Sequence, residues 1–309
     1  MKNLFIIGSP RSGTTFLASL LEMTEYGSPY ETQYILKYLD KLSDYGDLNV
    51  KPNFARLVKD ICAERAVAQR QPAFDIDQVF DELPKPIQYL DLVNYIFSSL
   101  VNESPSQSWG DKTPHYILKL GKLIRLFPNA KFIYLLRDGR DVAMSLLKKD
   151  WGPNNTLACA RDWTAANGDE NQLLIKKMQD EGQLTVVRYE SLVANYKEEV
   201  ERVLAFLGEP LEKHQDFIDQ QQARIKPDNF YKWKSQMSPR QIRDYEAAAG
   251  DVLKKQGYEL TTDYEQGLSA LREFGYDVHN FFVRWKNLFK MNVIDGIKIK
   301  FFGKQPFAD

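Results

Sequence analysis

The feature that most constrains the fold is a glycine loop that follows a short apolar segment near the start of the chain. Residues 2–7 have the pattern of a buried strand, residues 8–13 that of a turn, and residues 14–22 that of a helix with one apolar face. In this setting backbone N–H groups and the helix dipole bind phosphate. The run GSPRSGTT therefore predicts a phosphate loop in an α/β domain.

This loop differs from the loop that binds nucleoside triphosphates. Two glycines are separated by four residues in both, but Thr14 stands where the triphosphate loop requires a lysine for the γ-phosphate. The cation here is Arg11, inside the loop, and Ser12, Thr14 and Thr15 add hydroxyl donors. These loop residues suit a donor molecule that has no γ-phosphate. The plainer alternative is a glycine turn that only starts a helix.

The rest of the chain alternates between strand and helix patterns. In residues 31–103, apolar side chains recur at helical spacing, and we interpret this segment as a helical insert. We expect further strands at residues 108–111, 130–136 and 183–187, and helices at residues 116–127, 142–149, 190–207 and 239–256. Such alternation predicts an α/β fold of three layers, with a central, mainly parallel sheet flanked by helices.

Composition narrows the class of protein. The 309 residues allow one large α/β domain, which we place at residues 1–262, followed by a C-terminal extension at residues 263–309. The net charge of −1 gives no sign of a nucleic-acid partner. Cys62 and Cys159 lack a metal-binding spacing, so we expect no metal. The start of the chain lacks a signal-peptide core and no long apolar run follows, so we expect a cytoplasmic protein.

A second segment carries cations at the end of a predicted strand. Residues 130–137, AKFIYLLR, have the pattern of a strand with Arg137 at its end. Ser145 follows eight positions later in the next predicted helix. This spacing lets both side chains converge on one phosphate, with Arg140 as a second cation. In the plainer alternative, the two arginines are solvated charges paired with the neighbouring aspartates.

The two segments GSPRSGTT and FIYLLRDGRDVAMSL resemble the two segments that bind 3′-phosphoadenosine 5′-phosphosulfate (PAPS) in the sulfotransferase family. The similarity is to bacterial members related to protein-tyrosine and carbohydrate sulfotransferases, and it extends to about Tyr258. It implies a P-loop-like fold in which the first segment holds the 5′-phosphosulfate and the second the 3′-phosphate. The donor-binding residues that it implies are Pro10, Arg11, Ser12, Gly13, Thr14, Thr15, Arg137 and Ser145.

Three weaker blocks, WGDKTPHY, VRYESLV and YKWKSQMSP, are also similar to family segments. The resemblance places Tyr189 beside the adenine, although a core aromatic is an equal alternative. Lys232 and Lys234 resemble a mobile basic segment that closes over the nucleotide. The glycine- and lysine-rich closing motif of cytosolic sulfotransferases is absent, so which lysine faces the donor stays open.

Sulfonate transfer needs a base, cations for the sulfonate, and a donor to the departing phosphate oxygen. The resemblance implies that Lys112 contacts the leaving phosphate and that Glu31 is the base. Arg11 in the loop can contact the sulfonate during its transfer. His115 is the alternative base, because cytosolic members use a histidine shortly after the corresponding lysine. Plainer alternatives make Lys112 an exposed lysine and Glu31 a carboxylate at a helix N-terminus.

The acceptor is not identified by the sequence. We expect in-line transfer from PAPS to a hydroxyl or amine of a carbohydrate, lipid, peptide or small molecule, with adenosine 3′,5′-bisphosphate as product. The alternative functions are a P-loop small-molecule kinase and an inactive nucleotide-binding protein. Residues 281–304 carry six basic residues against Asp295, interleaved with aromatics, so they can contact a membrane peripherally, cover an acceptor cleft, or form a docked terminal helix. His214 and His279 are expected in surface helices without a functional role.

Overall fold

The computed structural model describes residues 2–27, 31–70, 74–101, 108–149, 152–223, 225 and 229–289. The chain divides into two compact units. The first, which we call the sheet unit, comprises residues 1–137 and 169–227, and the second, the helical unit, comprises residues 138–168 and 228–309. The division of the sequence at residue 262 stays a prediction.

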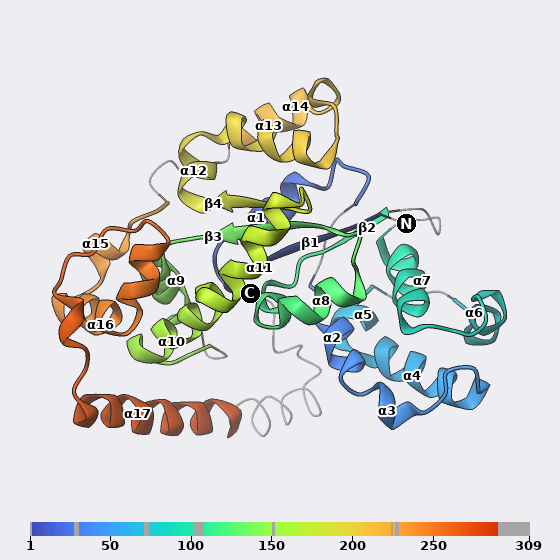
Figure 1. Cartoon of the computed structure of the whole chain (residues 1–309), viewed down its shortest axis with the longest axis horizontal. Coiled ribbons are helices and arrows are strands. Elements are labelled where there is room, and N and C mark those ends of the chain that lie inside the picture. The colour runs from blue at the N-terminus through green and yellow to red at the C-terminus, as the bar shows by residue number, and fades with distance from the viewer. Residues whose placement is uncertain are drawn as a thin grey trace, which may run out of the picture. The chain divides into compact units, whose positions relative to one another are not determined.

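The sheet unit is built on four strands, β1 (Lys2–Gly8), β2 (Ser108–Asp111), β3 (Lys131–Leu136) and β4 (Leu184–Arg188). They lie in the order β2-β1-β3-β4, and each neighbouring pair is parallel (Figure 1). Each predicted strand is confirmed to within one residue at either end. Because the strands run in one direction, their carboxyl ends share one edge of the sheet.

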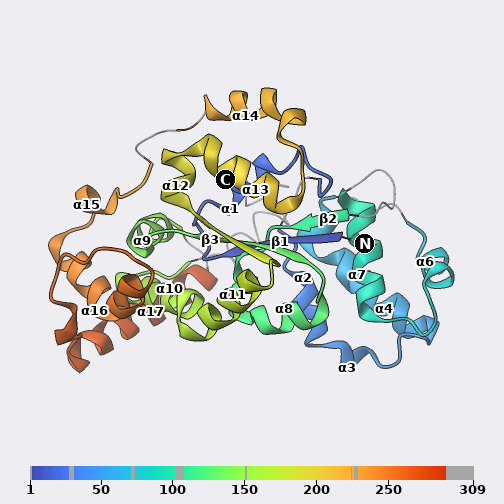
Figure 2. The same ribbon diagram turned by 45° about the horizontal axis from the view of Figure 1, so that its top comes forward.

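Side chains alternate between the two faces of this sheet. One face packs under α1 (Thr14–Leu20), α12 (Tyr189–Ala194), α13 (Tyr196–Leu207) and α14 (Gln215–Gln222), through Leu4, Ile6, Ile133, Leu135 and Val187. The other face carries an aromatic cluster in which Phe5 stacks on Phe132 at 5.4 Å and meets Trp109 edge-on at 5.5 Å. On that side lie the 3-10 helix η1 (Pro114–Lys119), α8 (Leu120–Leu126) and α11 (Asp169–Asp180) (Figures 1 and 2). The predicted three layers are present.

Within the described residues, the predicted helical insert contains six helices, which follow α1 and precede β2. They are α2 (Tyr34–Leu39), α3 (Leu42–Tyr45), α4 (Lys51–Ala63), α5 (Arg65–Ala68), α6 (Ile76–Glu82) and α7 (Tyr89–Val101). The helix α4 buries Phe54, Leu57, Val58 and Ile61, the positions at helical spacing that predict it. Phe97 of α7 stacks on Trp109 of β2 with ring centroids 4.0 Å apart, which ties the insert to the edge strand.

Two predicted helices are interrupted. The helix predicted at residues 116–127 begins as η1 and becomes α-helical only after Lys119, whose backbone is not helical. The helix predicted at residues 190–207 breaks at Asn195, which has φ −122° and ψ 52° and separates α12 from α13. Asparagine competes with helical backbone bonding, and this explains a break at that position. Gly208, at φ 81°, ends α13 as its position predicts.

The helical unit contains α9 (Gly139–Leu146), α10 (Thr156–Asn167), α15 (Trp233–Gln236), α16 (Pro239–Lys255), the 3-10 helix η3 (Tyr264–Gln266) and α17 (Ala270–Phe289). A Cβ at Gly139 would lie 2.2 Å from the Tyr245 hydroxyl, so only glycine lets α9 approach α16 this closely. The tail predicted at residues 263–309 is helical in α17, and residues 290–309 lie outside the described residues. Within the described residues, no helix combines the length and apolarity needed to cross a bilayer.

Candidate active site

The carboxyl edge of the sheet collects predicted site residues from all four strands. The glycine loop follows β1, Lys112 follows β2, Arg137 follows β3 and Tyr189 follows β4. Gly8 at the end of β1 pairs with Leu135, and Leu136 at the end of β3 pairs with Arg188. Ligands of open parallel sheets bind outside the carboxyl ends of the strands, so this edge is the candidate active site.

The loop after β1 has a backbone that its sequence dictates. Gly8 has φ 152°, and a Cβ there would lie 2.4 Å from the Leu135 carbonyl oxygen. Gly13 has φ 101°, and a Cβ there would lie 2.5 Å from the Tyr189 ring. Arg11 is held at φ 69°, in the left-handed region that side chains rarely adopt, with its side chain exposed. Sparsely populated backbone conformations cluster at binding sites, and this one turns a cation outward from the loop.

The interior of the loop contains an unsatisfied donor. The Ser12 side chain is fully buried, and its Oγ has no hydrogen-bond partner among the described residues. Thr14 is also buried, whereas Thr15 is exposed and Pro10 is half-buried. A buried hydroxyl without a partner is costly, by about 1–3 kcal/mol. The loop residues therefore fit an anionic group, such as a phosphosulfate, that would accept the Ser12 hydrogen bond.

Arg137 and Tyr189 are in contact with this loop. The guanidinium carbon of Arg137 lies 4.1 Å from the centroid of the Tyr189 ring, and Arg137 Nη1 donates to the Arg11 carbonyl oxygen at 3.4 Å. The Tyr189 ring is buried with its edge against Gly13. One face of the tyrosine thus supports the arginine and its edge supports the loop. Stacking of Tyr189 on adenine stays a prediction.

Glu31 and Lys112, the predicted base and the predicted partner of the leaving group, form an ion pair. Lys112 Nζ lies 2.9 Å from Glu31 Oε2, and the two side chains are 11% and 34% exposed. Gln33 Nε2 donates to the other carboxylate oxygen of Glu31 at 2.8 Å. The pair opens to solvent on the glutamate side. This is the arrangement that an incoming acceptor hydroxyl requires.

A clasp that the sequence did not reveal holds this pair together. Thr32 Oγ1 donates to Asp111 Oδ2 at 2.7 Å, and the backbone N–H groups of Thr32 and Gln33 each donate to Thr113 Oγ1 at 3.3 Å. The residues beside Glu31 are therefore bound to the residues on both sides of Lys112. No local pattern in the sequence signals this arrangement, because the bond between Thr32 and Asp111 joins positions 79 residues apart.

Asp111 is fully buried, and burial raises the pKa of its carboxyl to about 7. Hydrogen bonds from Thr32 and Thr113 act in the opposite direction, the Glu31 charge raises the pKa further, and the Lys112 charge lowers it. The carboxyl of the clasp thus changes its charge near neutral pH.

His115, the alternative base, lies on the exposed side of η1. The contact with Lys112 is made by Glu31 instead. This geometry favours Glu31 as the base.

The remaining predicted donor residues belong to the helical unit. Ser145 is half-buried on α9. Lys232 and Lys234 are exposed on either side of Trp233; Lys232 Nζ donates to Asn229 Oδ1 at 2.7 Å, and Lys234 Nζ lies 5.2 Å from the Tyr231 ring centroid. Arg137 ends the sheet unit and Ser145 belongs to the helical unit, so their convergence on one phosphate stays a prediction.

Arg140 has a structural role rather than the predicted role of a second phosphate cation. It is buried, with Nη2 2.8 Å from Asp138 and Nη1 2.6 Å from Glu246, and its guanidinium lies 3.6 Å from the Trp233 ring centroid. The alternative that paired it with an aspartate was right about the partner, but the pair is buried rather than solvated. Asp141 accepts from the backbone N–H of Trp233 at 3.0 Å, which fixes the segment that carries the two lysines.

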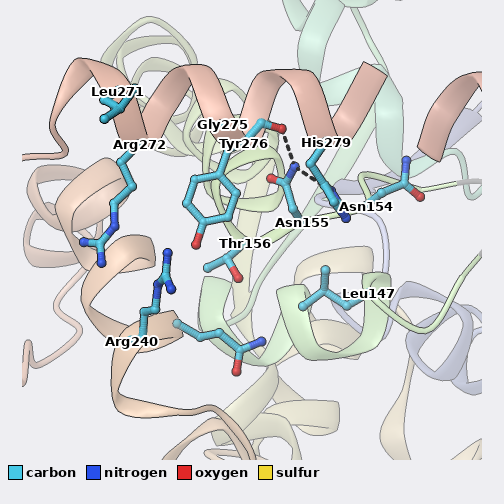
Figure 3. A pocket seen from close by; sticks show the side chains of 11 residues that line it. Leu147, Asn154, Asn155, Thr156, Arg240, Leu271, Arg272, Gly275, Tyr276 and His279 are labelled. Carbon is cyan, nitrogen blue, oxygen red and sulfur yellow. Dashed lines mark hydrogen bonds between the residues drawn. The ribbon is translucent and has the colours of Figure 1, made fainter. Parts of the chain in front are cut away.

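The two other histidines have no place at the carboxyl edge. His214 is buried, not at a surface, and its Nε2 lies 3.3 Å from Glu209. His279 lines a hollow of about 570 Å³ within the helical unit, between α17 and the first turns of α10 and α16 (Figure 3). Arg240 and Arg272 also line it, and both lie within 4 Å of buried Asp244, which compensates one of their two charges. None of the predicted site residues lines this hollow.

The family model described as "Sulfotransferase family" matches residues 3–213, and the chain therefore belongs to the sulfotransferase family. Among curated proteins it is 28% identical over 225 residues to nodulation protein NoeE of Sinorhizobium fredii, covering 66% of this chain and 49% of the relative. It is 24% identical over 288 residues to a protein-tyrosine sulfotransferase of Drosophila melanogaster, covering 84% and 52%. The chain thus spans about half the length of these curated relatives.

Two solved structures share the fold. A sulfotransferase domain from the curacin biosynthetic pathway matches with a TM-score of 0.54 and 19% identity, covering 84% of this chain and 98% of the domain. The sulfotransferase domain of the Synechococcus PCC 7002 olefin synthase matches with a TM-score of 0.57 and 20% identity, covering 84% and 96%. The predicted family and fold are confirmed, and the kinase alternative is not favoured.

Proposed function

We propose that this chain transfers a sulfonate group from PAPS to an acceptor hydroxyl or amine, with Glu31 as base and Lys112 at the leaving phosphate. The observation that carries the proposal is the carboxyl edge of the sheet. There, the glycine loop with the buried Ser12 hydroxyl, the Lys112–Glu31 pair, Arg137 and Tyr189 follow the ends of four parallel strands.

The donor side of the site uses groups suited to phosphate and sulfonate. Residues 10–15 would hold the 5′-phosphosulfate through backbone N–H groups and the hydroxyls of Ser12, Thr14 and Thr15. Arg137 would bind the 3′-phosphate together with Ser145, since a guanidinium and a hydroxyl can share one phosphate. Lys232 or Lys234 would close over the nucleotide from the segment that Trp233 anchors.

The chemistry follows from the partly exposed ion pair. Glu31 accepts the proton of the acceptor hydroxyl while the acceptor oxygen bonds to sulfur, and the bond between sulfur and the bridging phosphate oxygen breaks. Lys112 donates to that departing oxygen, and Arg11 stabilises negative charge on the sulfonate. Lys112 therefore exchanges its 2.9 Å contact with Glu31 for the donor, which leaves the carboxylate open to the acceptor.

Calorimetric titration tests the donor assignment. The purified chain is titrated with adenosine 3′,5′-bisphosphate and with ATP, each with and without magnesium. We expect tight binding of the bisphosphate that does not depend on magnesium. A preference for magnesium ATP would refute the proposal and favour a kinase.

The acceptor is sought once donor binding is established. Radiolabelled PAPS is incubated with the chain and with tyrosine peptides, oligosaccharides, lipids bearing hydroxyl groups and small alcohols in separate reactions. We expect label transfer to one of these hydroxyl classes. The names of relatives point to protein tyrosine as one class to include. Tight bisphosphate binding without transfer to any acceptor class would favour the inactive nucleotide-binding alternative.

A further inference from the structure

The helix α17 presents a continuous apolar stripe to solvent. At 3.6 residues per turn its members fall on one side of the helix. They are Phe274, Phe281, Phe282, Trp285 and Phe289, and each is between 52% and 66% exposed. Phe281 meets Phe282 edge-on at 5.6 Å, and Trp285 stacks on Phe289 at 6.1 Å, so the stripe is a contiguous aromatic surface. Contiguous exposed apolar surface of this kind marks an interaction site.

The opposite side of α17 is fixed to the helical unit. Tyr276 donates from its hydroxyl to Asp244 at 2.6 Å, and Asn155 Nδ2 donates to the Tyr276 carbonyl oxygen at 2.8 Å. Arg272 Nη1 lies 3.0 Å from Asp244. Figure 3 shows Tyr276 and Arg272 projecting from α17 toward the side of Thr156 and Arg240. These contacts set the rotation of the helix, so its apolar stripe faces away from the unit.

The charges on α17 are arranged around this stripe. Its two acidic residues, Glu273 and Asp277, both pair with Arg161 of α10. Beyond them the helix carries Arg284 and Lys286, which immediately precede and follow Trp285 and so flank the stripe on its two sides. The surroundings of the stripe are therefore basic.

This combination favours an anionic lipid surface over other occupants. The acidic residues of α17, Glu273 and Asp277, are already paired with Arg161, so a second copy placed face to face would bring basic flanks together while their acidic complement is engaged elsewhere. A bilayer surface instead accepts aromatic side chains at the level of its headgroups and places phosphates beside the flanking arginine and lysine. We propose that α17 binds an anionic lipid surface through this stripe. The inference does not depend on the proposed sulfonate transfer.

Vesicle sedimentation of the full chain tests the proposal. Phosphatidylcholine vesicles are compared with vesicles that also contain phosphatidylserine, and we expect sedimentation that increases with phosphatidylserine. The double variant Phe281→Ser/Trp285→Ser should lower the vesicle affinity by about tenfold or more, because it removes two exposed aromatic side chains that would become buried in the bilayer surface. Leu173→Ser is the matched control, since Leu173 of α11 is 72% exposed but isolated from the stripe, and it should bind like the unchanged chain.

Fluorescence gives a second readout. Trp109, Trp163 and Trp233 are buried, whereas Trp285 is exposed. Trp151 lies outside the described residues, so the measurement uses a Trp151→Phe background. In that background, quenching by brominated phospholipid should report on Trp285, and Trp285→Phe should remove most of it while sedimentation persists. Failure of the full chain to sediment with phosphatidylserine vesicles would overturn the proposal. The proposal would also be overturned if analytical ultracentrifugation showed a dimer without lipid and the double variant were a monomer. The stripe would then be an interface between two copies of the chain.

Discussion

Two charged clusters in this molecule use similar residues but differ in how completely those residues are satisfied. In the helical unit, Arg140 is fully enclosed by Asp138, Glu246 and the Trp233 ring. At the carboxyl edge of the sheet, Lys112 meets Glu31 in a pair that stays partly exposed. The closed cluster can only hold the fold together, whereas the open one can exchange a partner. Burial and completeness of bonding, rather than residue type, separate the structural cluster from the one that we propose to be catalytic.

The largest expected effect comes from the open cluster. Glu31→Gln keeps the size of the side chain but removes the base, so the transfer rate should fall by about 10²–10⁴-fold. Binding of adenosine 3′,5′-bisphosphate, measured by calorimetry, should stay within a few-fold of the unchanged chain. Glu64→Gln is the matched control, because Glu64 is also a partly exposed carboxylate paired with a lysine, but its partner is Lys37 and not Lys112. Full activity of Glu31→Gln would transfer the role of base to His115.

The closed cluster should respond in stability rather than in chemistry. Arg140→Met leaves the carboxylates of Asp138 and Glu246 buried without their cation, so the unfolding free energy should drop by about 3–5 kcal/mol. Urea denaturation followed by circular dichroism measures this loss. Arg161→Met, which breaks the exposed pairs with Glu273 and Asp277, should cost about 1 kcal/mol or less. Equal losses in the two variants would show that the closed cluster is not a structural anchor.

The clasp residue Asp111 should make stability depend on pH. Its folded pKa of about 7 lies above its ordinary value of 3.8, so the folded chain keeps a proton that the unfolded chain has lost. This contribution to stability is fully present below the ordinary pKa and is lost as the pH rises to about 7. The asparagine of Asp111→Asn does not titrate. The unfolding free energy of this variant should therefore rise relative to that of the unchanged chain by about 1.4 kcal/mol for each pH unit within this window.

Urea denaturation across the same pH range measures that gain, which should level off above the folded pKa. Asp40→Asn is the control. Lys119 and Lys122 lower the pKa of the Asp40 carboxyl below its ordinary value of 3.8, so the contribution of Asp40 changes with pH below this window, and the difference from the unchanged chain should be constant within it. A difference between Asp111→Asn and the unchanged chain that does not vary with pH would contradict the assigned shift.

Arg137 should have the smallest effect of the four. Arg137→Ala removes a charge-assisted contact, so affinity for adenosine 3′,5′-bisphosphate should fall by about 10- to 100-fold. Affinity for adenosine 5′-monophosphate, which lacks the 3′-phosphate, should change much less. Calorimetry of both ligands measures the difference. Equal losses for the two nucleotides would place Arg137 elsewhere than at the 3′-phosphate.

The sequence predicts the parts of the site that local chemistry determines. The glycine loop, the strand that ends at Arg137 and the helix stop at Gly208 each depend on residues within a few positions. The clasp of Thr32 on Asp111 depends on how six helices return the chain to β2, and a single sequence does not contain that information. Arg137 and Arg140 look alike in the run RDGRD, and only the burial of Arg140 beside Trp233 and Glu246 distinguishes their roles.

The central claim is that the carboxyl edge of the sheet is the donor site. A crystal structure of the chain with adenosine 3′,5′-bisphosphate tests it most directly. We expect the 5′-phosphate in the glycine loop, accepting a hydrogen bond from Ser12, and the 3′-phosphate on Arg137. Nucleotide bound in the hollow of the helical unit, with the Ser12 hydroxyl still without a partner, would contradict the claim.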